Sequence, residues 1–118
     1  MNPPENIILK TESRILRVEY GDGESFDLPF EYLRVNSPSA EVVGHGPGQE
    51  VLQVGKEDVS IARIEPVGLY AIRLVFDDGH NTGLYTWTYL RELGENYTQR
   101  WASYLDRLVA AGYPRRSD

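Results

Sequence analysis

Hydrophobic and polar residues alternate with a period of two over residues 14–20, the pattern of a half-buried β-strand. An acidic, glycine-containing segment at residues 21–24 supplies the positions that a tight turn needs. The alternation then resumes over residues 26–30, and a short helical turn is predicted over residues 31–34. These residues predict a β-hairpin followed by a helix.

A second hairpin of the same kind is predicted further along the chain. Alternation over residues 70–76 indicates a strand, and an Asp-Asp-Gly-His turn at residues 77–80 sends the chain back. Residues 84–87 lie on the return strand, and a short helix over residues 88–93 is expected to end at Gly94.

The last predicted element is an amphipathic helix over residues 96–112. Asn96 and Gln99 have the spacing of a capping box at its start, and Gly112 ends it before Pro114. Its apolar stripe, at the spacing of a helix face, comprises Trp101, Tyr104, Leu105 and Leu108. This stripe is expected to pack on the sheet.

The middle of the chain is less regular. Residues 35–55 are rich in glycine and proline and predict a long loop with a brief strand over residues 50–54, before another strand over residues 59–64. The whole predicts one domain over residues 1–118 of the α+β class, in which antiparallel β-hairpins form a sheet packed against a C-terminal amphipathic helix.

The two predicted hairpins end in the same tripeptide, Tyr-Leu-Arg, at residues 32–34 and 89–91. Two interpretations remain open. The units are an internal repeat, or they resemble each other because hairpin turns share a common chemistry.

Composition narrows the classes of function. The formal charge is −6 and the only run of basic residues is Arg115-Arg116, so nucleic acid is not an expected partner. The chain has no cysteine, which excludes disulfides, thiolate nucleophiles and cysteine-held clusters within it. The N-terminal residues lack the pattern of a secretion signal, and no stretch reaches the ~18 apolar residues of a membrane helix. We therefore expect a cytoplasmic protein that does not bind membranes.

The two histidines are the first candidates for chemistry. His45 lies in a Gly-His-Gly-Pro-Gly loop that lacks the lysine of a phosphate-binding loop, so a structural loop is the simpler interpretation. His45 and His80 form a two-histidine, one-carboxylate metal site if they converge with Glu41, Asp77 or Asp78. The alternative is that His80 only makes a backbone bond in its hairpin.

Aromatic and hydroxyl residues give weaker signals. Tyr85, Trp87 and Tyr89 form a stacking platform for a ligand if the strand continues through all three, but a core role is the simpler interpretation. Ser37 and Ser39 have no histidine and acid partner in the nearby sequence. No catalytic residue is assigned.

Two segments resemble a known family when taken together, namely residues 33–49 and the Asp-Gly-His-Asn-Thr-Gly-Leu-Tyr-Thr-Trp string of residues 78–87. They are similar to domain of unknown function 971, the gamma-butyrobetaine hydroxylase-like N-terminal domain. The likeness spans residues 7–93, and the helix over residues 96–112 is an extension of it.

The resemblance implies a metal site that this chain does not retain. In the carnitine-pathway hydroxylases such a domain holds zinc through a Cys-x-Cys-x2-Cys cluster and a later histidine. The cysteine positions fall on Ser37, Ser39 and Val42, and the histidine falls on His80. Hydroxyls are poor zinc ligands and valine offers no donor, so we expect no metal and no other cofactor.

The resemblance also implies a function. The iron and 2-oxoglutarate chemistry of those hydroxylases lies in another domain, whereas related domains are attached to Mrp/ApbC-type P-loop carriers of iron–sulfur assembly. We therefore expect a non-catalytic accessory module that binds a protein partner, such as a carrier of that type. The alternative is a small-molecule or metal-binding protein that uses the His45 loop and His80, and an independent enzyme comes third. The candidate docking or ligand surface comprises Ser37, Ser39, His45, His80, Tyr85 and Trp87.

Overall fold

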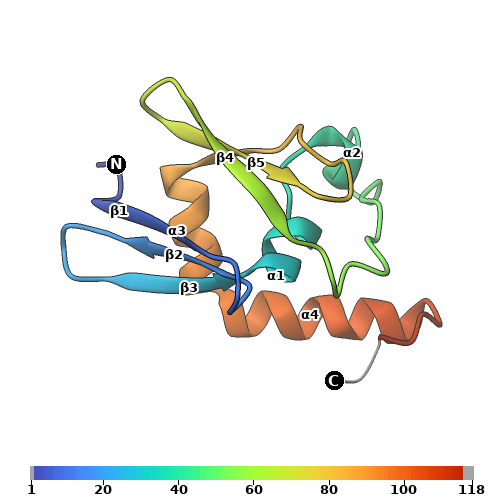
Figure 1. The fold of residues 1–118 in the computed structure, drawn as a ribbon. Coiled ribbons are helices and arrows are strands. Elements are labelled where there is room, and N and C mark those ends of the chain that lie inside the picture. Colours follow the sequence, from blue (N-terminus) through green and yellow to red (C-terminus); the bar gives the residue numbers. More distant parts are fainter. Residues whose placement is uncertain (1, 116–118) are drawn as a thin grey trace.

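The computed structural model describes residues 2–115 and has two three-stranded antiparallel sheets and four helices within them (Figure 1). The sheets have the strand orders β1-β2-β3 and β4-β5-β6. The α+β class is therefore confirmed. In chain order the elements are β1 (Asn6–Lys10), β2 (Ile15–Glu19), β3 (Ser25–Pro29), α1 (Phe30–Val35), α2 (Ala40–Val43), β4 (Ile61–Val67), β5 (Ala71–Phe76), β6 (Leu84–Thr86), α3 (Trp87–Glu95) and α4 (Tyr97–Ala110).

One hydrophobic core joins the two sheets to α1 and α3. The alternating residues of both predicted hairpins supply it, because every second side chain of a strand faces the same side. Its buried members include Leu16, Val18, Leu28, Leu33, Ile72, Leu74, Phe76, Tyr85, Leu90 and Leu93. No helix within the described residues is long and apolar enough to cross a membrane.

Helix α4 runs along the outside of the molecule, beside α1 (Figure 1). Its Tyr104 and Leu108 are buried against Val35 of α1, and Trp101 makes an edge-to-face contact with Tyr32 of α1. The predicted apolar stripe of α4 is thus its buried face. Much of this stripe packs against α1, which lies between α4 and the strands. The predicted capping role of Asn96 is wrong, because its side-chain amide donates to the Glu92 carbonyl and accepts no bond from the helix.

The structure departs from the sequence-based expectations in four further places. Strand β1 was missed because Ile7, Ile8 and Leu9 form a continuous apolar run without alternation. Residues 50–54 form no strand. The segment expected to be irregular contains the short helix α2, in which the Glu41 backbone amide donates to the Ser39 hydroxyl. Trp87 is the first residue of α3 and does not continue β6.

The two halves of the chain share one topology, because each is a three-strand meander followed by a helix. Their hairpin turns are closed by equivalent bonds. The Tyr20 amide donates to the Glu24 carbonyl over 2.8 Å, and the Phe76 amide donates to the His80 carbonyl over 3.0 Å. The similarity noted in the sequence therefore extends to the order of elements and to the bonds that close the two turns.

Each half also binds the turn of the other half. The Arg34 side chain of the first half pairs with Asp78 in the second turn, with 2.9 Å between nitrogen and oxygen. Arg91 of the second half pairs with Asp22 in the first turn at 2.8 Å. The arginine of each Tyr-Leu-Arg tripeptide thus ties its helix to the opposite hairpin.

The tyrosines of the same tripeptides form a second pair of reciprocal hydrogen bonds between the two halves. The Tyr32 hydroxyl in α1 donates to the Leu93 carbonyl near the end of α3, over 2.7 Å. The Tyr89 hydroxyl in α3 donates to the Asn36 carbonyl at the end of α1, over 2.6 Å. Since the last carbonyls of a helix have no partner within it, each half supplies a hydrogen bond that the helix end of the other half lacks.

Two glycines permit a close approach between the halves. A β-carbon at Gly94 in α3 would lie 2.4 Å from Cγ of Phe26, and one at Gly83 would lie 2.4 Å from Oγ of Ser37. The prediction that Gly94 ends its helix is wrong, because α3 continues to Glu95. Glycine is needed there for packing against the opposite sheet.

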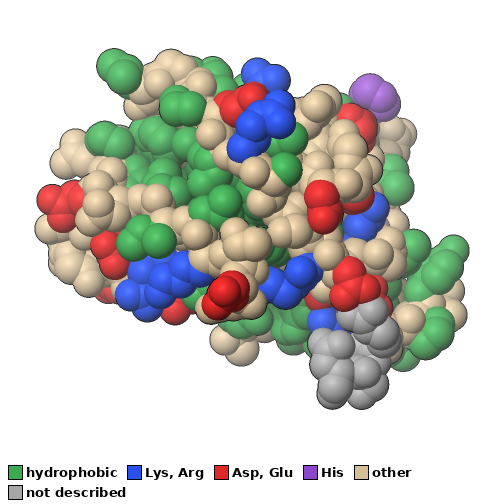
Figure 2. Space-filling model, viewed as in Figure 1, with side chains coloured by type: hydrophobic (Ala, Val, Ile, Leu, Met, Phe, Trp, Pro, Cys, Tyr) green, Lys and Arg blue, Asp and Glu red, His purple; other side chains and the backbone are tan. Residues whose placement is uncertain are grey.

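Acidic and basic side chains are interspersed on one face of the molecule. Figure 2 shows red and blue groups next to one another on the face in view, with hydrophobic side chains gathered towards its left. This face therefore offers no continuous basic track.

We predict that Gly94→Ala destabilises the protein by about 1–3 kcal/mol, because the new methyl group overlaps the Phe26 ring. In a helix interior without such a contact the same change would stabilise by about 1 kcal/mol. Chemical denaturation of Gly94→Ala, Phe26→Leu and the double variant measures the coupling. Gly46→Ala is the control, because a β-carbon there meets nothing within 4 Å. A neutral or stabilising Gly94→Ala would refute the packing role.

Candidate functional site

A buried hydrogen bond joins the end of α1 to the turn after β5. Oγ of Ser37 lies 2.8 Å from Nε2 of His80, across 43 residues of sequence. Ser37 is fully buried and His80 is 5% exposed, so solvent does not compete for this bond. The structure therefore brings together two of the residues singled out in the sequence.

Three more side chains extend this bond into a network, which we call the polar clamp: Ser37, Ser39, Glu41, His80 and Thr82. The hydroxyls of Ser39 and Thr82 lie 2.7 Å apart, and Thr82 donates to Oε1 of Glu41 over 2.8 Å. The other oxygen of Glu41 lies 3.7 Å from Nδ1 of His80. The clamp fastens the start of the segment after α1 to the loop between β5 and β6.

An ion-pair network supports the clamp from the side of α1. Asp78 accepts hydrogen bonds from Arg34 over 2.9 Å and from Lys56 over 2.8 Å. Its other oxygen accepts from the His80 backbone amide over 3.1 Å. Burial by itself raises the pKa of Asp78, but these bonds outweigh it and lower the pKa to about 2.

Burial keeps His80 neutral over a wider pH range than a free histidine. It is the main cause that lowers the pKa of His80, and the positive charge of Arg34 adds to it. Glu41 and Asp78 oppose the shift without cancelling it. A neutral imidazole has one donor and one acceptor nitrogen, which suits a ring held between a hydroxyl and a carboxylate.

Ser37, His80 and Glu41 follow one another in the order of a nucleophile, a base and an acid, yet the arrangement suits a structural role. A serine nucleophile must reach the carbonyl of a substrate. Ser37 is 0% exposed, and its Oγ also accepts a bond from the Ser39 amide over 3.3 Å. The Ser37 hydroxyl therefore makes its hydrogen bonds inside the clamp and does not face solvent.

The residues at the family's zinc positions do not fit zinc. The Ser39 hydroxyl is bonded to Thr82, and Val42 is the buried hydrocarbon side chain of α2. Within residues 2–115 no three His, Cys, Asp or Glu side chains are grouped so as to hold a metal ion. His45 is exposed on the loop after α2, whereas His80 is buried. The hypothesis that both histidines and an acid converge has no support in this geometry.

The three aromatic residues considered as a platform have separate roles. Tyr85 is fully buried, its hydroxyl donates to the Leu33 carbonyl over 2.6 Å, and burial raises its pKa. The indole of Trp87 donates to the Leu69 carbonyl, and Tyr89 bonds the end of α1. These side chains hold the fold together.

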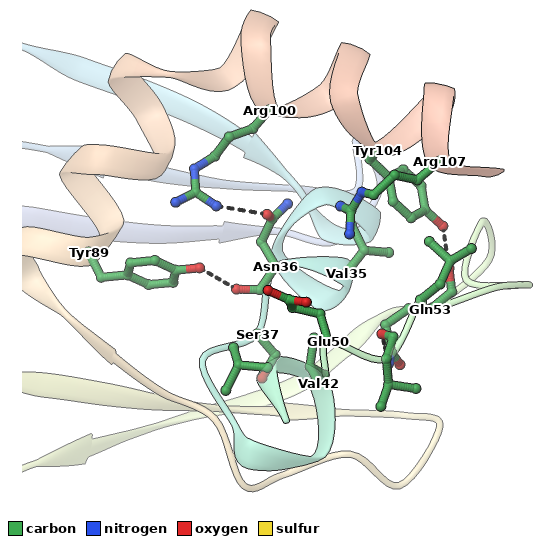
Figure 3. A pocket seen from close by; sticks show the side chains of 13 residues that line it. Val35, Asn36, Ser37, Val42, Glu50, Gln53, Tyr89, Arg100, Tyr104 and Arg107 are labelled. Carbon is green, nitrogen blue, oxygen red and sulfur yellow. Dashed lines mark hydrogen bonds between the residues drawn. The ribbon is translucent and has the colours of Figure 1, made fainter. Parts of the chain in front are cut away.

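A small pocket of about 160 Å³ lies beside the clamp, between the end of α1, residues 42–53 and the helices α3 and α4 (Figure 3). Ser37 of the clamp lines this pocket, and so does Val42, which follows Glu41 of the clamp in the sequence. No local pattern in the sequence predicts this pocket, because its charged residues Glu50, Arg100 and Arg107 come from a loop and a distant helix.

We predict that stability falls as the pH is lowered from about 7 to about 5, because His80 takes up a proton more readily in the unfolded chain. When folding lowers the pKa of a histidine, the neutral side chain contributes its full stability above the pKa of the unfolded state. That stability is lost as the pH falls from the unfolded-state pKa towards the folded-state pKa. Urea denaturation across this range is the measurement. His80→Gln should flatten the profile, and His45→Gln, at an exposed site, should leave it unchanged. An identical profile for His80→Gln and the wild type would contradict the assignment.

Comparison with known proteins places the chain. The family model described as "Gamma-butyrobetaine hydroxylase-like, N-terminal" matches residues 7–91. Two NMR solution structures are 51% and 48% identical, with TM-scores of 0.85 and 0.83. They cover 100% and 98% of this chain, which covers 93% and 86% of theirs.

A crystal structure from Acidithiobacillus ferrooxidans is 44% identical, with a TM-score of 0.64 over 77% of this chain and 91% of that one. It is of a protein of unknown function that belongs to the family of domain of unknown function 971. No curated protein matches the sequence. The chain therefore belongs to the gamma-butyrobetaine hydroxylase-like N-terminal family, also known as domain of unknown function 971.

Proposed function

We propose that this protein is a non-catalytic accessory module that docks a partner protein through the loop of residues 38–50. The observation that carries the proposal is the polar clamp, which fixes the base of this loop while its outer residues stay exposed. Ser37 is buried at the base, and Val43, His45 and Glu50 are exposed beyond it. Exposed loops held by a rigid scaffold are common sites of recognition.

The proposed partner is a P-loop carrier of iron–sulfur clusters of the Mrp/ApbC type. Related domains are attached to such carriers, which supports a shared task in the maturation of iron–sulfur or other metal-cofactor proteins. The chain has no cysteine with which to hold a cluster through thiolates. In this proposal the partner supplies the nucleotide and cluster chemistry, and the module supplies a binding surface.

The alternative in which both histidines bind a ligand has less support. His80 is buried and its ring nitrogens face Ser37 and Glu41 within the clamp. His45 is exposed on the loop, so it is available to a docking partner.

We predict that Val43→Asp combined with His45→Ala weakens binding to a purified Mrp/ApbC-type carrier from the same genome at least tenfold, as measured by biolayer interferometry. The loop variant changes two exposed side chains and should keep the wild-type melting temperature. Leu69→Asp, at the 93% exposed tip of the hairpin between β4 and β5, is the matched control and should bind as the wild type does. Unchanged binding by the loop variant would rule out docking through this loop.

We further predict that a chelator leaves the melting temperature of the purified protein unchanged. The clamp consists of oxygen and neutral imidazole groups that satisfy one another, so the fold needs no ion to bridge them. Thermal unfolding with and without the chelator, together with elemental analysis, is the test. Stoichiometric zinc with a lowered melting temperature after chelation would show that a metal holds the fold.

A further inference from the structure

The pocket of Figure 3 is too small for a nucleotide or a peptide segment and suits a compact ligand. Its volume is about 160 Å³, whereas sites for drug-sized molecules occupy ~300–1,000 Å³. The α4 side of the pocket carries Arg100, Tyr104 and Arg107, and the opposite side carries Val42 and Glu50 (Figure 3). A ligand here would touch both the docking loop and the C-terminal helix.

Most polar groups in the wall already have partners within the protein. The Asn36 side chain accepts from Arg100 and donates to the Tyr32 carbonyl. The Gln53 side chain accepts a hydrogen bond from Arg34, and the Gln53 backbone carbonyl accepts one from the Tyr104 hydroxyl. These groups form the wall of the pocket, and their hydrogen bonds within the protein leave them less available to bind a ligand.

Two charged groups remain, and they have opposite signs. Within the described residues, neither Arg107 nor Glu50 has an ion-pair or hydrogen-bond partner for its charged group. The Arg107 guanidinium lies over the Tyr104 ring, 5.9 Å from its centre. Both residues line the pocket without pairing with each other, so a ligand that carries both charges can bridge them.

The rest of the wall is hydrocarbon. Val35 and Val42 are buried beside the pocket and Leu52 is half-buried, while Val43 and Val51 are 44% and 53% exposed. The backbone bond from the Val51 amide to the Val42 carbonyl, 2.8 Å long, holds this surface together. An aliphatic group placed against it would cover apolar area that water now contacts.

We propose that this pocket binds a free aliphatic α-amino acid, with its carboxylate on Arg107, its ammonium group on Glu50 and its side chain against the valines. This inference does not depend on the identity of the docking partner. Because Arg107 and Glu50 are exposed, each contact contributes modestly, and binding should be weak, in the high micromolar to millimolar range.

The test uses L-valine and two blocked forms of it with the full chain, measured by NMR titration of the backbone amides. L-Valine should shift the amides of residues 35–53 and 100–107. Valine amide lacks the carboxylate and N-acetylvaline lacks the ammonium group, so each should bind about fivefold more weakly or worse. No shifts with L-valine at millimolar concentration, or equal affinities for the three compounds, would overturn the proposal.

Two variants assign the contacts. Arg107→Gln should weaken L-valine binding about fivefold but leave valine amide unaffected, and Glu50→Gln should weaken L-valine but leave N-acetylvaline unaffected. Arg63→Gln, on the exposed face of β4, is the control and should bind all three as the wild type does. Circular dichroism confirms that each variant is folded. Variants that lose affinity equally for all three compounds would contradict the assigned pairing and overturn the proposal.

Discussion

The reciprocal hydrogen bonds that tyrosine hydroxyls make between α1 and α3 are the interaction on which the rest of the structure depends. Tyr32 and Tyr89 each donate to a carbonyl at the end of the opposite helix, and the first of these bonds is buried and the second partly buried. A buried carbonyl without a partner would cost about 1–3 kcal/mol, so each half is completed by the other. This explains why the two three-stranded meanders share one core, since neither sheet buries both its helix end and its apolar face alone.

The candidate functional region lies where the repeat ends. The first half is followed by the clamp and the long loop, and the second half is followed by α4. These two unequal continuations meet at the pocket, whose wall draws on residues 42–53 and on α4. Equivalent positions also differ between the turns, because His80 is buried where Glu24 of the first turn is exposed. Symmetric contacts maintain the fold, and the asymmetric segments are free to carry recognition.

The sequence predicted what depends on local period and missed what depends on a distant partner. The strands β2, β3 and β5 follow from alternation because one face of each is buried. Gly94 was misread as a helix end, since its role depends on Phe26 of the other sheet. Ser37 and His80 were linked only through the family's zinc positions, and nothing local marks Arg107 and Glu50 as neighbours of one pocket.

The groups of the clamp differ in chemistry from the cysteine cluster that the family resemblance implies. Thiolates that converge in a low-dielectric site repel one another and need a cation to hold them together. Here the converging groups at the core of the clamp are hydroxyls and an imidazole kept neutral by burial, and the one carboxylate, Glu41, is largely exposed. The same two segments are therefore joined by neutral groups at the core of the clamp, beside the ion pair of Arg34 and Asp78.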